Sequence, residues 1–296
     1  MDASDLRIFE AVARLGAMNR AASELNTVQS NVTARIRALE RELETPLFRR
    51  HRGGVVLTAA GERLLPYALR IRRMIDEARS VARDDGAPKG RLIVGALEST
   101  AAHRLSPLLA DYVAAHPAVD LVLRTGTSCE LIDKTLAYEV DGAFVCGPVD
   151  HRDLVGEVVF REELVLVTAR GARGFAALPH ARDLKLVVLR AGCSYRQRLE
   201  TLLAARGVAA TRILEFGTLD AIVACVAAGL GVTLLPKTVV AQAVRDRRVR
   251  EHELAPVEAA VETLFIRRRD AHISSALAAF LDAARRAERI AANAAE

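Results

Sequence analysis

The sequence predicts an α+β multidomain protein with three parts: a helical N-terminal domain that ends in a two-stranded wing, a long linker helix, and a C-terminal α/β domain of two lobes. Apolar residues recur at helical spacing over residues 6–43 and at heptad spacing over residues 64–82. After residue 90, strand-like runs alternate with helical segments, which is typical of an α/β domain. Because 51% of the 296 residues are apolar, the chain can bury more than one core.

Charge and hydropathy narrow the range of partners. Lys and Arg number 42 against 37 Asp and Glu, and the net charge of +5 fits an anionic partner without demonstrating one. The densest basic run is Arg49, Arg50, His51 and Arg52. The N-terminus lacks the pattern of a secretory signal, and no segment approaches the roughly 20 apolar residues of a membrane span. We therefore expect a cytoplasmic protein with no membrane partner.

The cysteine pattern gives no sign of a metal or of a disulfide framework. The four cysteines are Cys129, Cys146, Cys193 and Cys225. They are widely spaced, form no C-x-x-C pair and have no histidine partners at metal-ligand spacing. The sequence predicts reduced thiols, no metal site and no cofactor.

Residues 1–58 are predicted to form a helix-turn-helix. The first helix has an apolar face that includes Phe9, and Gly16 can end it. A short second helix, with Asn19 as its expected N-cap, precedes a turn at Asn26 and Thr27. The third helix places its apolar residues at steps of four, three and four, namely Val32, Ile36, Leu39 and Leu43. Two short helices joined by a tight polar turn are typical of a helix-turn-helix.

The segment from Phe48 to Thr58 is predicted to be the wing. Gly53 and Gly54 separate a basic flank from the apolar run that begins at Val55. Strand-forming residues on both sides of a glycine turn favour a two-stranded antiparallel ribbon.

Many residues of this region fall in the register of one family pattern. They are Ala21, Ala22, Leu25, Gln29, Ser30, Ile36, Leu39, Glu40, Pro46, Leu47, Phe48, Arg49, Leu57, Thr58 and Gly61. The chain therefore resembles the LysR-type bacterial transcriptional regulators. The resemblance implies a sequence-specific regulator that is not an enzyme, whose third helix enters the major groove of double-stranded promoter DNA. It also implies RNA polymerase as a further partner.

The resemblance assigns a DNA-binding set. Gln29, Ser30 and Thr33 are expected to reach base edges. The arginines of the set are Arg35, Arg37, Arg50 and Arg52. The two in the wing are expected to sit over phosphates, which position a protein without reading sequence. For the helix arginines the alternative is a solvated face balanced by nearby glutamates.

Two positions depart from the family pattern. Val28 stands where the family has a hydroxyl N-cap, so we expect Thr27 or Asn26 to cap the third helix instead. Ala34 replaces a commonly basic residue. Arg35 lies about 100° further round the helix and is the candidate for the missing phosphate contact.

Residues 59–89 are predicted to form a linker helix and a hinge. Thr58 is the expected N-cap, and Pro66 predicts a bend. The heptad stripe consists of Leu64, Ala68, Ile71, Ile75, Ala78 and Ala82. In the resembled family this helix pairs two subunits, so we expect a homodimer or homotetramer. The alternative is that the stripe packs against its own chain. Residues 84–90 are expected to be a flexible hinge.

Residues 90–296 are predicted to form two α/β lobes around a mostly parallel sheet. Expected strands cover residues 91–97, 119–125, 142–146, 186–189, 212–216 and 232–235. Residues 163–168 and 261–266 are expected to cross between lobe I (about 90–162 and 266–296) and lobe II (about 163–265). The motifs Asp141 to Phe144 and Gly229 to Val232 also match the LysR-type pattern. This implies a periplasmic-binding-protein-like effector domain.

The expected effector site lies beyond the carboxyl ends of the strands, where ligands bind in open parallel sheets. Hydroxyl residues stand directly before predicted helices at Ser99, Thr100, Thr127, Ser128 and Thr218. Helix N-termini attract anions, so we expect a carboxylate-bearing small molecule; the alternative is ordinary N-capping. Glu98 opposes a purely anionic ligand and favours an amino group. The opposite side of the cleft is expected to contribute Cys193, Tyr195 and Arg196.

Other functions fit parts of the sequence. A thiol redox-sensing regulator on the same scaffold would use Cys193 with Cys129, Cys146 or Cys225. Arg190 and Arg196 would lower the pKa of Cys193. An enzyme is disfavoured because the sequence has no G-x-S-x-G elbow, Walker A loop, H-E-x-x-H motif or Rossmann glycine fingerprint. A solute-binding protein would need a signal peptide and would not carry residues 1–58.

Overall fold

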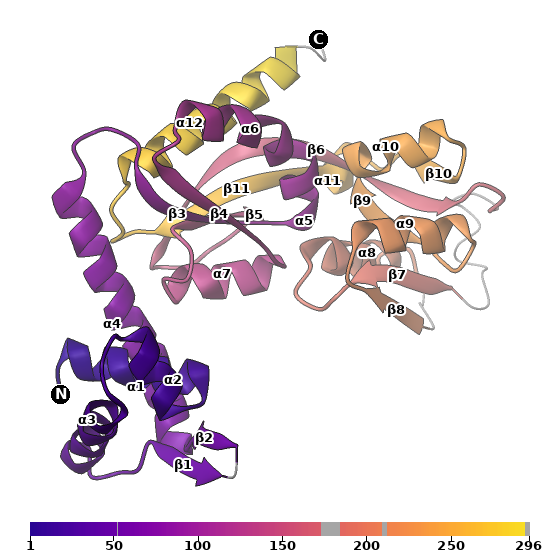
Figure 1. The fold of residues 1–296 in the computed structure, drawn as a ribbon. Helices are drawn as coiled ribbons and strands as arrows, with labels where there is room; N and C mark the ends of the chain where they lie inside the picture. Colours follow the sequence, from indigo (N-terminus) through magenta and orange to yellow (C-terminus); the bar gives the residue numbers. More distant parts are fainter. Residues whose placement is uncertain (52, 173–183, 209–211, 294–296) are drawn as a thin grey trace. The chain divides into compact units, whose positions relative to one another are not determined.

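The computed structural model describes residues 1–51, 53–172, 184–208 and 212–293 (Figure 1). The chain divides into two compact units. One is formed by Met1–Asp84 with Ala137–Glu139, and the other by Asp85–Leu136 with Val140–Glu296. Each unit buries its own apolar core.

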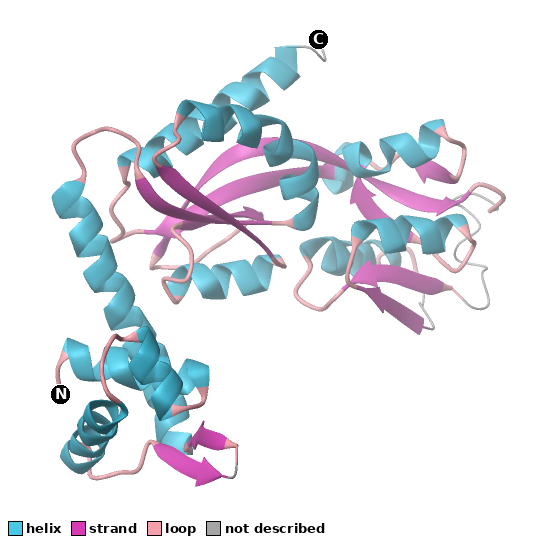
Figure 2. Cartoon of the chain, in the orientation of Figure 1, coloured by secondary structure: helices cyan, strands magenta, loops and turns pink. Residues whose placement is uncertain are grey.

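Helices and a short antiparallel sheet make up the N-terminal unit (Figure 2). They are α1 (Ala3–Leu15), α2 (Met18–Glu24), α3 (Gln29–Glu42), β1 (Phe48–His51), β2 (Gly54–Leu57) and α4 (Ala59–Arg83). A capping box of Asp2 and Asp5 begins α1, and Gly16 ends it at φ 65°. Thr58 caps α4 by accepting from the Gly61 N–H at 3.1 Å. The predicted helix-turn-helix, wing and linker helix are therefore confirmed.

Two predicted caps are wrong. The N-cap of α2 is Ala17, which has no side-chain hydrogen bond to the helix, and Asn19 lies inside the first turn. Only Ala17 separates Gly16 from α2, so the helix starts before Asn19 can cap it. Val28 is the N-cap of α3, again without a side-chain hydrogen bond. Thr27 does not cap the helix, because its hydroxyl accepts from the Asn31 side chain at 3.0 Å.

The stripe predicted on α4 divides into two parts. Ala68 is buried, and Leu64 and Ile71 pack against the core of the N-terminal unit, so this half meets its own chain. The C-terminal half of the stripe is largely exposed. Large apolar side chains are exposed one position before the predicted stripe, at Tyr67, Met74 and Val81. The helix is continuous through Pro66.

The second unit is built on one long mixed sheet. Its strands are β3 (Gly90–Ala96), β4 (Val119–Thr125), β5 (Gly142–Cys146), β6 (Leu154–Ala169), β9 (Thr233–Pro236), β10 (Val249–His252) and β11 (Ala260–Arg268). They follow the order β10-β6-β11-β5-β3-β4, and β9 pairs with β6. A separate parallel pair is formed by β7 (Lys185–Leu189) and β8 (Arg212–Phe216).

The prediction of a mostly parallel sheet is wrong. Strand β3 runs parallel to β4 and β5, whereas β11 is antiparallel to β5 and β6. The 16-residue strand β6 also pairs antiparallel with β9 and β10. Strands β6 and β11, which cross between the lobes, are antiparallel to their neighbours, so the sheet is mixed. Strand ends of both lobes still meet at one cleft.

Helices cover both lobes. Lobe I carries α5 (Glu98–Thr100), the π-helical turn η1 (Ala101–Leu105), α6 (Ser106–Ala115), α7 (Ser128–Leu136) and α12 (Ser275–Asn293). Lobe II carries α8 (Ser194–Ala204), α9 (Leu219–Ala227), α10 (Lys237–Arg245) and α11 (Pro256–Ala259). Phe144 anchors the lobe I core, with ring centroids 5.0 Å from Phe265 and 5.6 Å from Phe160. Within the described ranges, no helix combines the length and the apolar character that a membrane span requires.

Candidate functional site

Helix α3 presents a polar outer face. Val32, Ile36 and Leu39 bury its inner side against the N-terminal core. The exposed residues are Gln29, Ser30, Asn31, Ala34, Arg37, Ala38, Arg41 and Glu42, and Thr33 is half-buried. Gln29, Ser30 and Arg37 of the predicted set therefore lie on one exposed side of the helix. This is the arrangement required for side chains that enter a groove.

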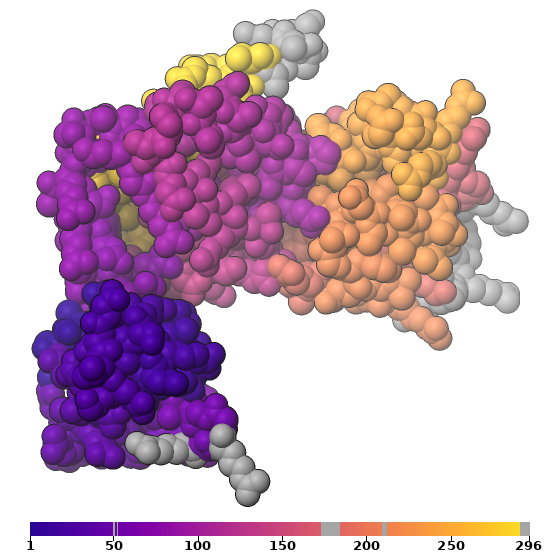
Figure 3. Space-filling model, viewed as in Figure 1, coloured from indigo at the N-terminus to yellow at the C-terminus, as the bar shows by residue number. Residues whose placement is uncertain are grey.

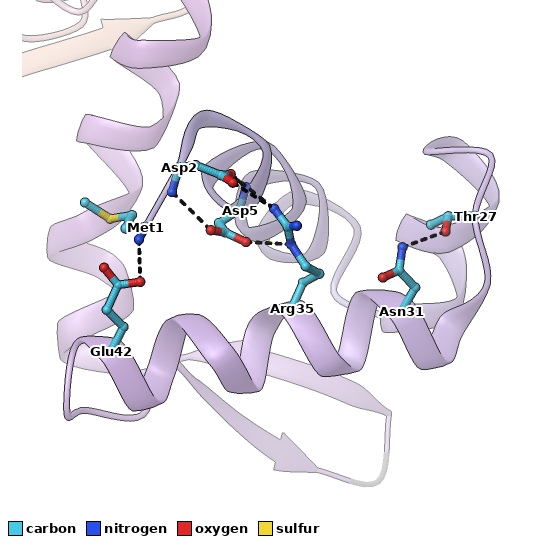
Figure 4. Close-up of polar contacts among 7 residues, drawn as sticks. All are labelled: Met1, Asp2, Asp5, Thr27, Asn31, Arg35 and Glu42. Carbon is cyan, nitrogen blue, oxygen red and sulfur yellow. Dashed lines mark hydrogen bonds and ion pairs between the residues drawn. The ribbon is translucent and has the colours of Figure 1, made fainter.

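Arg35 faces helix α1 (Figure 4). Its guanidinium lies 2.7 Å from the Asp5 carboxylate and 3.1 Å from that of Asp2. The backbone N–H of Asp5, assisted by Arg35, holds the pKa of Asp2 below its ordinary value. The N-terminal amine of Met1 also pairs with Glu42 at the other end of α3. Arg35 thus fastens α1 to α3, which accounts for its place away from the outer face.

Asn31 is a surface residue that the sequence reasoning missed. It is exposed in the first turn of α3, on the same side of the helix as Arg35, and its Nδ2 donates to the Thr27 hydroxyl at 3.0 Å (Figure 4). This bond orients the amide, and Oδ1 and the second N–H of Nδ2 make no hydrogen bond to a described residue. An Asn amide can pair bidentately with adenine N6 and N7, so the residue type alone made Asn31 a candidate for a base contact.

The wing has the predicted form. Strands β1 and β2 pair antiparallel from Phe48 opposite Leu57 to His51 opposite Gly54. Arg50 lies in β1 opposite Val55. Arg52 lies outside the described residues.

A cavity of about 240 Å³ lies between the two lobes. Figure 3 shows the lobes, magenta and orange, in contact along their boundary. The lining residues are Leu97, Glu98, Ser99, Thr125, Gly126, Thr127, Ser128, Cys146, Leu189, Arg190, Cys193, Ser194, Tyr195, Gly217 and Thr218. They follow the carboxyl ends of β3, β4, β5, β7 and β8. This is the place where open parallel strands bind ligands.

Seven of the nine predicted effector residues line this cavity, and Thr100 and Arg196 do not. Thr100 is fully buried, and its hydroxyl has no hydrogen-bond partner in the described part of the chain. This side chain is therefore enclosed in lobe I and does not line the cavity. Arg196 pairs instead with Glu200 at 3.1 Å and Glu215 at 3.0 Å.

Hydroxyl groups join the lobes across the cavity. Ser99 of lobe I lies 3.2 Å from the Tyr195 hydroxyl of lobe II. Ser194 of lobe II donates to Ser128 of lobe I at 3.0 Å. Burial raises the pKa of Tyr195 well above its ordinary value, so its phenol stays neutral. Neutral hydroxyls can exchange partners with a ligand at little cost, since each serves as donor and acceptor.

Charged groups stand at the cavity edge. Glu98 Oε1 accepts from the Leu219 N–H of lobe II at 3.2 Å. Arg190, which the effector set omitted, binds Glu130 of lobe I at 2.9 Å. The Thr127 N–H, together with Arg190, holds the pKa of Glu130 below its ordinary value. Of the omitted lining residues, Ser194 begins the helix after β7 and Cys146 is the last residue of β5.

The cysteine thiols of the cavity are buried. Burial raises the pKa of Cys193, although backbone N–H groups and the charge of Arg196 act to lower it. Burial also raises the pKa of Cys146. A raised pKa keeps a thiol protonated and unreactive at neutral pH. The lowering that the neighbouring arginines suggested in the sequence is thus outweighed.

Comparison with protein families covers nearly the whole chain. The description "Bacterial regulatory helix-turn-helix protein, lysR family" matches residues 3–62, and "LysR substrate binding domain" matches residues 85–289. The chain belongs to the LysR family of transcriptional regulators: a DNA-binding protein with an effector-binding domain, and not an enzyme.

Relatives and solved structures agree with this. The regulator GltR of Bacillus subtilis (strain 168) is 43% identical over 276 residues, 93% of each chain. YofA of the same organism is 42% identical over 282 residues, 95% of this chain and 98% of the relative. Full-length CbnR with its target DNA has a TM-score of 0.66 at 26% identity, covering 97% and 100%. A full-length OxyR variant from Pseudomonas aeruginosa has a TM-score of 0.71 at 22% identity, covering 96% and 95%, and shows the fold alone.

Proposed function

We propose that a carboxylate-bearing small molecule binds in the cavity and thereby controls how this regulator binds its promoter DNA. The observation that supports this most is the meeting of three helix N-termini, those of α7, α8 and α9, around a cavity lined by hydroxyls. Helix N-termini and hydroxyl donors together favour a carboxylate without needing a full positive charge.

The ligand acts by changing how the lobes meet. It can shift an equilibrium only through its difference in affinity between two arrangements. Two of the contacts that join the lobes, Ser99 to Tyr195 and Ser128 to Ser194, lie in the cavity wall. A ligand that takes over these hydroxyls replaces direct contacts between lobes with contacts through itself.

On the DNA side, the outer face of α3 reads bases and the arginines hold the backbone. Gln29, Ser30 and Thr33 are proposed to reach base edges, and Asn31 joins them. Arg37, Arg50 and Arg52 are proposed to contact phosphates. The contacts of Arg35 with Asp2 and Asp5 favour a role in positioning α1 over the phosphate contact expected for it.

A homodimer or homotetramer is proposed, with α4 as the pairing helix. Tyr67, Met74 and Val81 follow a spacing of seven residues and are exposed. An apolar heptad stripe is what a partner helix covers. The partnership with RNA polymerase stays a prediction.

A binding screen tests the effector. Small carboxylates are added to the full chain, and the unfolding temperature and the affinity for DNA selected from a random library are measured. We expect a carboxylate that raises the unfolding temperature and changes DNA affinity, and both effects should weaken in Ser128→Ala and Ser194→Ala. If no carboxylate raises the unfolding temperature, or if binding leaves DNA affinity unchanged, the proposal is wrong.

The thiol redox-sensing alternative is weaker. Burial keeps Cys193 and Cys146 protonated, which opposes reaction with an oxidant. Peroxide should therefore leave DNA binding unchanged in the wild type. A response that Cys193→Ser abolishes would favour the redox alternative over the metabolite effector.

A further inference from the structure

We propose that the ligand of the cavity is a zwitterion of the α-amino acid class, with its ammonium group bound by Glu98. This inference rests on the proposed function, which supplies the carboxylate half of the ligand. It is supported by the hydrogen bonds and ion pairs that the three helix N-termini and the charged groups around the cavity already make within the protein.

Two of the helix N-termini are occupied by side chains of the protein. At α7, the Thr127 N–H donates to Glu130 at 3.0 Å and the Glu130 N–H donates to the Thr127 hydroxyl at 3.3 Å. At α9, Thr218 accepts from the Ala221 N–H at 3.3 Å, and Glu98 accepts from the Leu219 N–H at 3.2 Å. A ligand carboxylate at either place would have to displace one of these groups.

The N-terminus of α8 is open by comparison. Its N-cap, Cys193, makes no side-chain hydrogen bond to the helix, and a thiol is a weak acceptor. The first residue of the helix, Ser194, also brings its hydroxyl to the cavity beside that of Ser128. The ligand carboxylate is therefore assigned to α8, on the lobe II side.

Glu98 supplies the charge for the other end of the ligand. Within the described lining of the cavity, Glu98 and Arg190 are the only charged side chains. Arg190 is engaged by Glu130. Glu98 uses Oε1 for the Leu219 N–H, and its Oε2 makes no hydrogen bond or ion pair with a described residue. An anion without a cationic partner repels a second carboxylate and attracts an ammonium.

The two groups come from different lobes and line the same cavity. Glu98 follows β3 of lobe I, and the α8 N-terminus follows β7 of lobe II. A ligand with a carboxylate alone satisfies α8 and leaves Glu98 unpaired, whereas an amino acid satisfies both. The volume of about 240 Å³ lies below the roughly 300–1,000 Å³ of pockets for drug-sized ligands, which suits a small metabolite.

The experiment compares matched ligands on the full-length protein. The common L-amino acids are screened one by one by thermal shift. The 2-hydroxy acid and the simple amine with the same side chain are then titrated beside the strongest amino acid by calorimetry. We expect the amino acid to bind, and the loss of its ammonium group to weaken binding by about 10- to 100-fold.

Glu98→Gln tests the residue. The glutamine oxygen can still accept from the Leu219 N–H, so the variant removes charge while keeping the contact between lobes. We expect amino acid affinity to fall by about 10- to 100-fold, with no loss for the hydroxy acid. Glu163→Gln is the control, because Glu163 pairs with Lys237 at the surface and does not line the cavity.

The outcomes separate the two proposals. If the 2-hydroxy acid binds as well as the amino acid, the zwitterion is wrong and the carboxylate effector stands. If the amine binds with the same affinity as the amino acid, and Glu98→Gln abolishes its binding, both the zwitterion and the carboxylate effector are wrong. If no carboxylate binds, both proposals fail. The ligand comparison on the wild type decides these cases even if Glu98→Gln does not fold.

Discussion

Arg35 and Arg37 stand two positions apart on α3 but have different surroundings. Arg35 contacts Asp2 and Asp5, whereas Arg37 is exposed on the outer face. We expect Arg37→Ala to weaken binding to all DNA alike and to lower the salt dependence of log K by about one. Arg35→Ala should leave that slope unchanged and cost under about 1 kcal/mol of stability, as for exposed ion pairs.

Titration of DNA binding against salt, beside thermal unfolding, distinguishes these two arginines. If Arg35→Ala lowers the salt dependence of log K as much as Arg37→Ala does, Arg35 also reaches a phosphate. Local sequence offers no reason to separate them, because the carboxylates that hold Arg35 lie about 30 positions away in the chain, at Asp2 and Asp5.

Asn31 should contribute to the recognition of one base pair. Its amide is oriented by Thr27 and exposed on α3. We expect Asn31→Ala to lose about 1–3 kcal/mol of discrimination at one base pair while binding to unrelated DNA is preserved. Selection from a random DNA library measures this. Asn19→Ala on α2 is the matched control, and equal preference profiles for both variants would contradict the assignment.

His252 introduces a pH dependence of stability. Its Nε2 lies 2.9 Å from the Thr168 hydroxyl, and burial, assisted by Arg250, lowers its pKa below the ordinary 6.5. A lowered pKa in the folded state means that stability is present above pH 6.5 and is lost as pH falls below it. Denaturant melts from pH 8 to pH 5 should show a smaller loss in His252→Gln than in the wild type. An unchanged profile would rule this out, and His103→Gln, at an exposed position, is the control.

Among the elements, the strands show what local sequence can predict. The predicted bounds 119–125, 142–146 and 212–216 agree with β4, β5 and β8. Each is a short apolar run next to turn residues, so the information is local. The direction of β11 cannot be predicted from local sequence, because it depends on how the chain returns from lobe II. For the same reason the sequence predicted the hydroxyls at strand ends but missed Arg190, whose partner Glu130 belongs to the other lobe.

Helix α4 should hold two subunits together through its exposed apolar side chains. The N-terminal core covers Ala68 of the predicted stripe and leaves Tyr67 exposed, so the apolar surface available to a partner helix lies one position earlier, and pairing along it stays a prediction. We expect Met74→Glu to raise the dimer dissociation constant at least about tenfold, since each buried Met contributes about 1.5–3 kcal/mol. Sedimentation measures the effect. Ser80→Glu, at an exposed polar position of α4, should leave the dimer intact, and dissociation by both variants would contradict a specific stripe.

For the whole effector unit, the approach of the two lobes depends on a glycine. Gly192 has φ 88°, and a Cβ at this position would lie 2.9 Å from Thr127 Oγ1 and 3.2 Å from Cys129 Cβ, both in lobe I. Gly207 has φ 68°, and a Cβ there would have no described atom within 4 Å, so this glycine has the same backbone strain without the contact. Alanine at either position should cost about 1–2 kcal/mol for the left-handed backbone.

The difference between these two alanine variants isolates the contact between the lobes. Gly192→Ala should hold the lobes further apart, weaken ligand binding and blunt the effect of ligand on DNA affinity. Gly207→Ala should lower stability and leave the ligand response intact. Small-angle scattering with and without ligand, beside calorimetry, measures both quantities. If the two variants respond to ligand alike, closure of the lobes at Gly192 does not control this regulator, and the signal must arise within one lobe.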